Sequence, residues 1–170
     1  MTNEIIAVIA NLALALSVIV AVIFGIAQVR AAARDRKERL TLSTLSTFQT
    51  REFSELILYI TRRELPSSQK ELSARPNDEQ VIFIQFGQQM ESLGMLVAEG
   101  YINIDLVDKT LGSFVVTAWE KYRNIFMDIR EKSPDPFLGE YFQWLAENID
   151  RRMKENPRKP FYSDPVNRGH

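Results

Sequence analysis

The feature that most constrains this chain is an uninterrupted apolar segment near its N-terminus. No side chain from Ile5 to Val29 carries a charge, and most of them are aliphatic. A helix rises about 1.5 Å per residue and the hydrocarbon core of a bilayer is about 30 Å thick, so a helix of this length spans a membrane with some tilt. The segment therefore predicts one transmembrane helix.

The flanks of this segment favour a retained anchor over a cleaved signal peptide. A signal peptide begins with positive charge and has an apolar stretch of about 7–15 residues. Here Glu4 precedes the segment, and the apolar stretch is longer. The basic residues follow it instead, at Arg30, Arg34, Arg36, Lys37 and Arg39. Residues 1–29 are therefore expected to form the anchor.

This basic cluster also predicts the orientation of the anchor. Lys and Arg close to a membrane span stay on the cytoplasmic side. The N-terminus is therefore expected outside, and the residues after Arg30 in the cytoplasm, at the inner (plasma) membrane of a bacterium. The same charges attract anionic headgroups, which makes membrane lipids expected partners. A topology signal alone is the simpler explanation of the cluster.

Small side chains recur along one face of the predicted span. Residues three or four apart share a face of a helix. In lipid, Ala and Gly let two helices approach closely, and Ser or Gln can hydrogen-bond between them. This face predicts self-association into a homo-oligomer. Its residues are Ala10, Ala13, Ser17, Ala21, Gly25 and Gln28.

A pore is the alternative interpretation of the span. Asn11 is the only amide deep within it, and together with Ser17 it would line a water-filled axis between several copies. However, these few polar groups among alanines would give water in a channel few hydrogen-bonding partners. A hydrogen bond between helices explains Asn11 more simply.

The residues that follow the anchor predict an all-α fold. Residues 30–65 contain neither Gly nor Pro, so a basic juxtamembrane stalk helix is expected to continue from the span. The Ser- and Thr-rich stretch 41–50 lowers helix propensity and is the place for a break. Two prolines mark the segment 66–77, which is expected to be a loop.

Residues 78–156 are expected to form a small cytoplasmic helical bundle. Counted together with the preceding stalk, the bundle is expected to contain about four helices. Asn77 is expected to cap the first helix of this part, and Gly100 to end it. Three apolar stripes at helical spacing supply the core. These stripes are Ile82, Phe86, Met90, Leu93 and Val97; Val115, Trp119, Tyr122, Phe126 and Ile129; and Leu138, Tyr141, Leu145, Ile149 and Met153.

Further boundaries follow from Gly, Asp and Pro. A short helix over 103–110 is expected to be separated from the next helix by Gly112. Asp135 is expected to cap the last helix, with Pro136 at its first position. Residues 157–170 hold three prolines and few apolar groups, so an extended tail is expected.

The composition leaves little catalytic chemistry. The chain has no Cys, and its one His is His170, at the C-terminus. Thiolate catalysis, disulfides and cysteine metal sites are excluded, and there is no Gly-rich phosphate loop. A net charge of −1 gives no basic field for nucleic acid. No enzymatic activity and no cofactor are expected.

Two groups of charged residues remain as candidates. A divalent cation or an acid–base reaction would use carboxylates such as Glu91, Glu99, Asp105 and Asp108, but their spacing matches no calcium loop, and capping or solvation explains them more simply. Basic residues form the second group, a candidate anion patch, although exposed charges are the commoner outcome. These are Arg62, Arg63, Lys121 and Arg123.

The order of these features resembles a bacterial and phage family described only as a domain of unknown function, DUF4760. The resemblance rests on the N-terminal span with its basic exit and on three short strings. These are Glu91-Ser92-Leu93-Gly94, Trp119-Glu120-Lys121-Tyr122-Arg123 and Tyr141-Phe142-Gln143-Trp144-Leu145. It implies a membrane-anchored helical protein without assigned activity, and it supplies no catalytic residue.

The leading functional expectation is a non-enzymatic interaction or regulatory module. A single span holds a cytoplasmic helical bundle at the membrane, and the protein associates with itself and with an unidentified protein partner. The aromatic residues of the last two helices would offer an anchor to that partner where they are exposed. The membrane pore is the alternative.

Overall fold

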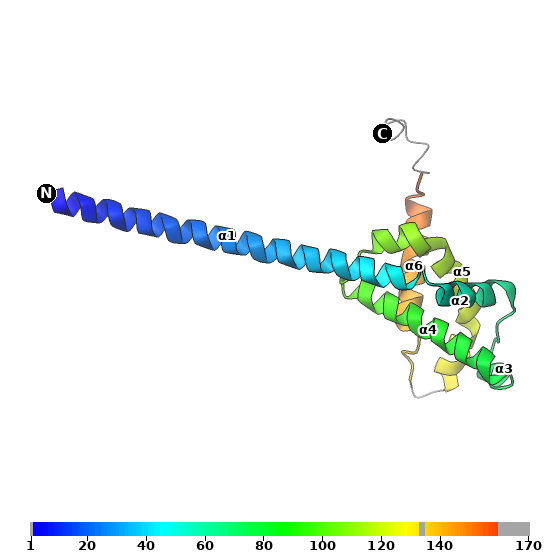
Figure 1. Ribbon diagram of the computed structural model, residues 1–170. Coiled ribbons are helices and arrows are strands. Elements are labelled where there is room, and N and C mark those ends of the chain that lie inside the picture. The colour runs from blue at the N-terminus through cyan, green and yellow to red at the C-terminus, as the bar shows by residue number, and fades with distance from the viewer. Residues whose placement is uncertain (1, 133–134, 160–170) are drawn as a thin grey trace. The chain divides into compact units, whose positions relative to one another are not determined.

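The chain is helical in the computed structural model, which describes residues 2–132 and 135–159 (Figure 1). No strand occurs in these two ranges, so the predicted all-α fold is confirmed. The helices are α1 (Thr2–Thr47), α2 (Arg51–Arg62), α3 (Gln69–Ser73), α4 (Asn77–Ala98), α5 (Ile104–Lys132) and α6 (Glu140–Glu155).

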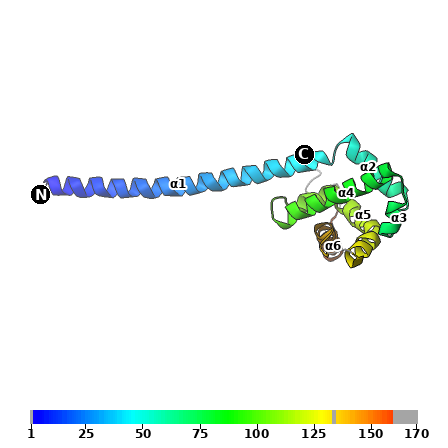
Figure 2. The same ribbon diagram turned by 90° about the horizontal axis from the view of Figure 1, so that it is seen from below.

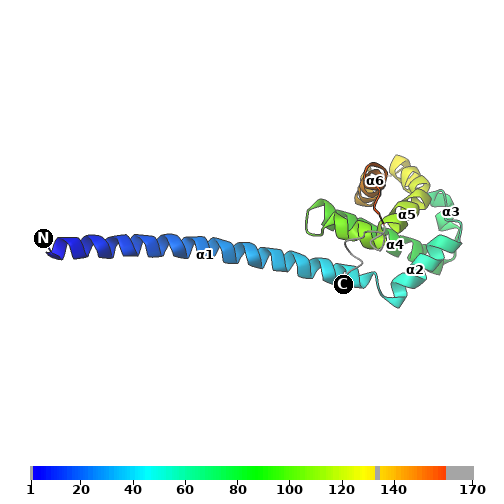
Figure 3. The same ribbon diagram turned by 90° about the horizontal axis from the view of Figure 1, so that it is seen from above.

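The chain divides into two compact units, residues 1–42 and residues 43–170. The first unit belongs to α1, which continues without interruption as one rod through the apolar segment and the basic cluster (Figures 2 and 3). Every described side chain from Ile5 to Leu40 is exposed. This unit therefore has no core of its own.

The expected break in the Ser- and Thr-rich stretch lies between α1 and α2. Helix α1 ends at Thr47, and α2 begins at Arg51. The Oγ1 atom of Thr50 accepts a hydrogen bond from the backbone N–H of Phe53 at 3.2 Å, so Thr50 is the N-cap of α2. A Thr side chain satisfies one of the free N–H groups at a helix start, which favours a new helix here.

Helix α2 is amphipathic and joins the core of the second unit. Its side chains Phe53, Leu56 and Ile60 are buried. Its C-terminal end is held by Lys121 of α5, whose Nζ atom donates to the carbonyl oxygens of Ile60 at 2.6 Å and Thr61 at 3.0 Å. A cation at this end satisfies terminal carbonyls and complements the helix dipole.

The segment 66–77, expected to be a loop, instead contains α3. Ser68 is its N-cap and accepts from the backbone N–H of Glu71 at 3.3 Å. The carboxylate of Glu71 in turn accepts from the N–H of Ser67 at 2.8 Å. This Ser-x-x-Glu pattern is related to the capping box, and it is the sequence signal for α3 that the two prolines obscured.

The expected cap of α4 is also wrong by one position. Asn77 is the first residue of α4, and the N-cap is Pro76, which makes no side-chain capping bond. The acidic residues Asp78 and Glu79 do occupy the first turn, where they favour the positive end of the helix dipole. Gly100, with φ of 72°, follows the end of α4 as expected.

Gly112 does not separate two helices, because α5 is continuous from Ile104 to Lys132. This glycine is buried, and a Cβ atom there would lie 2.5 Å from Asp108 Oδ1 and 2.9 Å from Met153 Cε of α6. The residue therefore provides room for packing. A glycine in a helix interior costs only about 1 kcal/mol, which a close helix contact offsets.

The start of α6 also differs from expectation. The helix begins at Glu140, not at Pro136, and its N-cap is Gly139 with φ of 73°. The carboxylate of Asp135 accepts from the N–H of Phe137 at 2.9 Å. Asp135 thus stabilises the preceding turn, an alternative use of short acidic side chains. At the other end, α6 ends at Glu155, before Pro157, as predicted.

The core of the second unit lies where α6 packs against both α4 and α5 (Figures 2 and 3). The rings of Phe83 and Tyr122 stack with centroids 4.3 Å apart, and Phe86 lies 5.3 Å from Tyr122. The Tyr122 hydroxyl donates to the Phe83 carbonyl at 3.0 Å, and burial raises the pKa of Tyr122. The predicted apolar stripes thus meet in one core, except that Tyr141 of the α6 stripe is outside it and the neighbouring Phe142 is fully buried instead.

Candidate functional site

The apolar part of α1 is the first candidate site. Among the residues described, it is the one helix long and apolar enough to cross a membrane, with a mean hydropathy of 2.8 over its most apolar stretch. The large apolar side chains from Ile5 to Val29 have exposed fractions between 48% at Ile26 and 70% at Val29. The apolar surface that this helix exposes is therefore larger than the apolar patches usual on soluble monomers.

The small residues of this helix do share one face. At about 100° of rotation per residue, the six predicted self-association residues fall within an arc of about 120° around Ser17. The Ser17 hydroxyl donates to the carbonyl of Ala13 at 2.8 Å, which satisfies it within the helix. At Gly25 nothing lies within 4 Å of an added Cβ, so the backbone is open to close approach.

Asn11 lies beside this face, about 120° around the helix from Ser17. Neither Asn11 nor Gln28 has a hydrogen-bond partner within the described part of the chain. An amide in lipid needs such a partner, and another helix can supply it.

The basic cluster continues the same helix. Arg34 pairs with Glu38 at 3.0 Å, with both side chains exposed. The cluster's other basic residues make no ion pair within the described residues. Asp35 and Glu38 are its two acidic residues, so positive charge remains in excess over this stretch. An exposed helix of this composition suits the headgroup region of a membrane.

The first string of the family resemblance joins α4 to α6. The carboxylate of Glu91 accepts from the backbone N–H groups of Tyr141 at 3.2 Å and Phe142 at 2.8 Å, at the start of α6. At Gly94 a Cβ atom would lie 2.2 Å from the Tyr141 carbonyl oxygen. Glu91 thus caps α6, and Gly94 lets the two backbones touch.

The other two strings belong to the same helix junction. Trp119 and Tyr122 are buried in the core, while Lys121 holds the end of α2. In α6, Phe142 and Leu145 are buried. The strings therefore hold the four main helices of this unit together.

The candidate carboxylates have separate structural surroundings. Asp105 pairs with Arg152 of α6, and Asp108 lies 3.5 Å from Arg158. The side chain of Asp108 is only 8% exposed, and its Oδ1 atom has no hydrogen-bond partner. Glu99 is exposed at the end of α4. Within the described ranges, no three Asp, Glu, His or Cys side chains gather as metal ligands do.

The predicted anion patch does not form as a free group of cations. Lys121 is engaged with the carbonyls at the end of α2. Arg63 pairs with Glu79 of α4, and its guanidinium lies 5.1 Å from the ring centroid of Tyr59. Arg62 and Arg123 remain exposed. The cations that approach one another are therefore used to fix helix ends.

The last two helices expose part of their aromatic surface. Trp119, Tyr122 and Phe142 fill the core, whereas Trp144 is 38% exposed. Phe137, just before α6, is 64% exposed. These two side chains are the aromatic groups of this region that a protein partner could contact.

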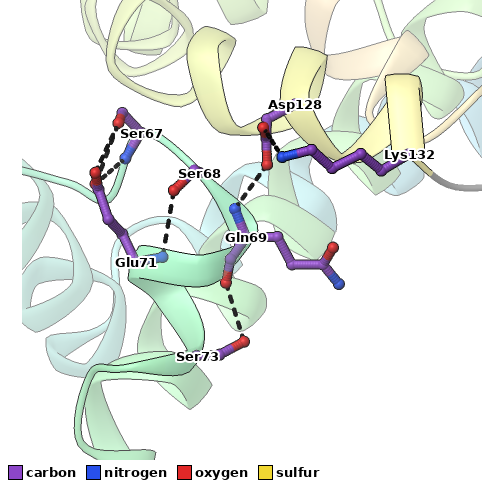
Figure 4. Close-up of polar contacts among 7 residues, drawn as sticks. All are labelled: Ser67, Ser68, Gln69, Glu71, Ser73, Asp128 and Lys132. Atoms are coloured by element: carbon purple, nitrogen blue, oxygen red, sulfur yellow. Dashed lines mark hydrogen bonds and ion pairs between the residues drawn. The ribbon is translucent and has the colours of Figure 1, made fainter.

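Helix α3 is attached to α5 by a small polar cluster (Figure 4). The carboxylate of Asp128 accepts from the backbone N–H of Gln69 at 2.9 Å, and it also pairs with Lys132. The hydrogen bond from Lys132, followed by that from Gln69, lowers the pKa of Asp128. None of the side chains of α3 is fully buried, so this carboxylate is a principal attachment of the helix.

The comparisons with known proteins agree with the motifs and the fold. Neither curated proteins nor solved structures gave a match to the chain. The model of one protein family matches residues 15–149, from the middle of the apolar segment to the buried Ile149 of α6. The chain therefore belongs to the family described as a domain of unknown function, DUF4760.

Proposed function

We propose that this protein is a single-pass membrane protein that associates with itself and presents a non-enzymatic helical module for interaction or regulation. The observation that carries the proposal is the exposed apolar face of α1, which continues directly into a basic cluster. The module is placed at the cytoplasmic face of the inner membrane, because positive residues flank a span on that side.

Self-association is supported by the arrangement of side chains in the span. Ala21 and Gly25 have small side chains, so another helix can approach this face closely. Asn11 and Gln28 carry amide groups that need hydrogen-bond partners. Contact between copies along this face brings two backbones close together and gives the Gln28 amide a partner on the other helix, and Asn11, beside the face, bonds at the edge of such a contact. Exposed Trp144 and Phe137 supply a surface for a further protein partner.

The self-association test uses Ala21→Leu, with Ala15→Leu as the matched control. Ala15 is a small residue in the same span but lies about 160° around the helix from Ser17. The full chain is reconstituted in lipid with donor and acceptor fluorophores, and energy transfer is measured as the protein-to-lipid ratio changes. Ala21→Leu is expected to weaken association at least fivefold, and Ala15→Leu to leave it near the wild-type level.

Two results would contradict this part of the proposal. One is a wild-type chain that stays monomeric at every protein-to-lipid ratio. The other is an equal loss in both variants, which would mean that the small-residue face is not the contact.

The pore alternative draws less support from the geometry. Asn11 and Ser17 lie on different parts of the helix surface, and the Ser17 hydroxyl is already bonded to Ala13. Conductance in planar bilayers tests it directly. We expect no current from the reconstituted chain, and a current that Asn11→Leu abolishes would favour the pore.

A further inference from the structure

A cleft in the second unit is unaccounted for by anchoring or self-association. It lies between α3, α4, α5 and the turn before α6, and its volume is about 720 Å³. Sites for small organic ligands commonly enclose about 300–1,000 Å³. Among the described residues, its walls come from four separate segments. We call it the α3–α5 cleft.

The floor of the α3–α5 cleft is apolar. Phe83 and Phe126 contribute rings that are otherwise buried in the core, at 3% and 7% exposure. Leu72 of α3 and Ile84 of α4 also line the cleft, and Ile84 is 49% exposed. At Gly139 a Cβ atom would lie 2.9 Å from the Phe126 ring, so the absence of a side chain there lets the turn close against the floor.

The rim of the cleft offers neutral hydrogen-bonding groups. Gln69, Gln88 and Ser92 line it, and their side chains have no partner among the described residues. Carboxamide and hydroxyl groups bind carbonyl, amide or hydroxyl groups of a ligand and give it orientation. An apolar floor with a few such groups at its edge is typical of sites for small organic molecules.

The charges of the lining decide between ligand classes. Among the described residues that line the cleft there is no Lys or Arg, and Glu91 is the one carboxylate. A phosphate or carboxylate ligand would meet this negative charge without a cation. The Glu91 oxygens already accept from the N–H groups of Tyr141 and Phe142, so a cation would meet a carboxylate that is already engaged. The lining therefore favours a ligand without net charge.

We propose that the α3–α5 cleft binds an uncharged small molecule with an apolar body and carbonyl, amide or hydroxyl groups at its edge. The apolar body contacts Phe83, Phe126 and Ile84, and the polar groups bond to Gln88 and Ser92. Helix α3 forms one wall, and the backbone N–H of its Gln69 donates to Asp128 of α5 (Figure 4).

The test uses the absence of native Cys, which permits single-cysteine variants of the full chain. Ile84→Cys places a thiol in the cleft. Val81→Cys is the matched control, because Val81 lies on the same helix with 52% exposure, against 49% for Ile84, and does not line the cleft. The rate of reaction with N-ethylmaleimide is measured for both variants in nanodiscs.

Two probes of similar size distinguish the ligand classes. The first is 1-aminoanthracene, which is uncharged at neutral pH, and the second is anthracene-1-carboxylate, which is an anion. The uncharged probe is expected to slow the reaction of Ile84→Cys at least fivefold and that of Val81→Cys less than twofold. The anion is expected to require at least a tenfold higher concentration for the same protection.

Several outcomes would overturn the proposal. Equal protection of both variants would mean that the probe acts through the lipid, and equal protection by the anion would refute the charge argument. The absence of protection up to the solubility limit would refute a ligand site. A reaction of Ile84→Cys that slows with protein concentration alone would show that a second copy covers the cleft.

Discussion

At the scale of single residues, this protein uses polar side chains of one helix to complete the ends of another. The carboxylate of Glu91 in α4 accepts from N–H groups in the first turn of α6, and the Lys121 ammonium of α5 donates to the last carbonyls of α2. Each contact satisfies backbone groups that a helix end leaves free. The charged residues that seemed candidates for chemistry are therefore better explained as parts of the helix junction.

The role of Glu91 predicts the effect of a conservative change. Glu91→Gln retains one acceptor oxygen but loses the charge that faces the start of α6, so it is expected to lower the free energy of unfolding by about 1–2 kcal/mol. Glu99→Gln is the control, because Glu99 is exposed. Denaturation followed by circular dichroism measures both, and equal stabilities would contradict the capping role.

The two buried glycines of α4 predict opposite results for the same substitution. At Gly94 an added Cβ meets the Tyr141 backbone, whereas at Gly87 the nearest atom is Phe126 Cζ at 3.4 Å. Gly94→Ala is expected to lower the free energy of unfolding by about 3 kcal/mol or more. Gly87→Ala is expected to leave it unchanged or raise it by up to about 1 kcal/mol. Thermal unfolding of the two variants decides the comparison.

Asp128 predicts a local dependence on pH. Its pKa is lower in the folded chain than in the unfolded chain, so its contribution to the attachment of α3 is complete above about pH 4. This contribution is lost as the pH falls through the folded pKa. Protection of the Gln69 amide against hydrogen exchange, taken relative to the intrinsic rate at each pH, is expected to fall in that acidic range. In Asp128→Ala, which removes the acceptor, this protection should already be low at neutral pH, and unchanged protection would refute the attachment.

At the scale of helices, the spacing of apolar residues predicted the structure better than single Gly, Pro or Asp residues taken as helix boundaries. The apolar stripes of α4, α5 and α6 are confirmed, because burial of a helix face requires the same spacing in any fold. Gly112 and Asp135 were misinterpreted, since a Gly can serve close packing and an Asp can stabilise a turn. Helix α3 was missed because its signal is only Ser68 and Glu71 between two prolines.

The basic cluster of α1 predicts the orientation of the span. If its positive charge directs the following residues to the cytoplasm, replacement of Arg30, Arg34, Arg36, Lys37 and Arg39 by Gln is expected to reverse or mix the orientation. Protease accessibility in sealed inner-membrane vesicles measures this. Substitution of Arg62 and Arg123, which lie far from the span in sequence, is the control, and unchanged protection of the first variant would contradict the sorting role.

At the scale of the molecule, the chain separates an exposed apolar helix from a unit with a buried core. The length and the apolar segment were enough to predict an anchor with a small helical fold. The span and three short strings gave the resemblance to DUF4760, which the family-model match over residues 15–149 confirms. The α3–α5 cleft was beyond sequence analysis, because its lining comes from four segments whose proximity depends on tertiary packing. The same limit applies to the partners of Glu91 and Lys121.

This separation predicts the behaviour of a shortened chain. Residues 43–170 form their own compact unit with a continuous apolar core, so they are expected to stay folded and dissolved without detergent. The full chain is expected to need lipid or detergent because of the exposed apolar surface of α1. Ultracentrifugation and circular dichroism test both statements. Aggregation of the shortened chain would mean that its core is incomplete.

The contact at Gly94 limits how the helical module can move. Where backbone meets backbone, no layer of flexible side chains remains to absorb a sliding displacement between α4 and α6. This crossing acts as a pivot, so any rearrangement on partner binding must turn the two helices about it. Motion would then be smallest at Gly94 and grow toward the far ends of both helices.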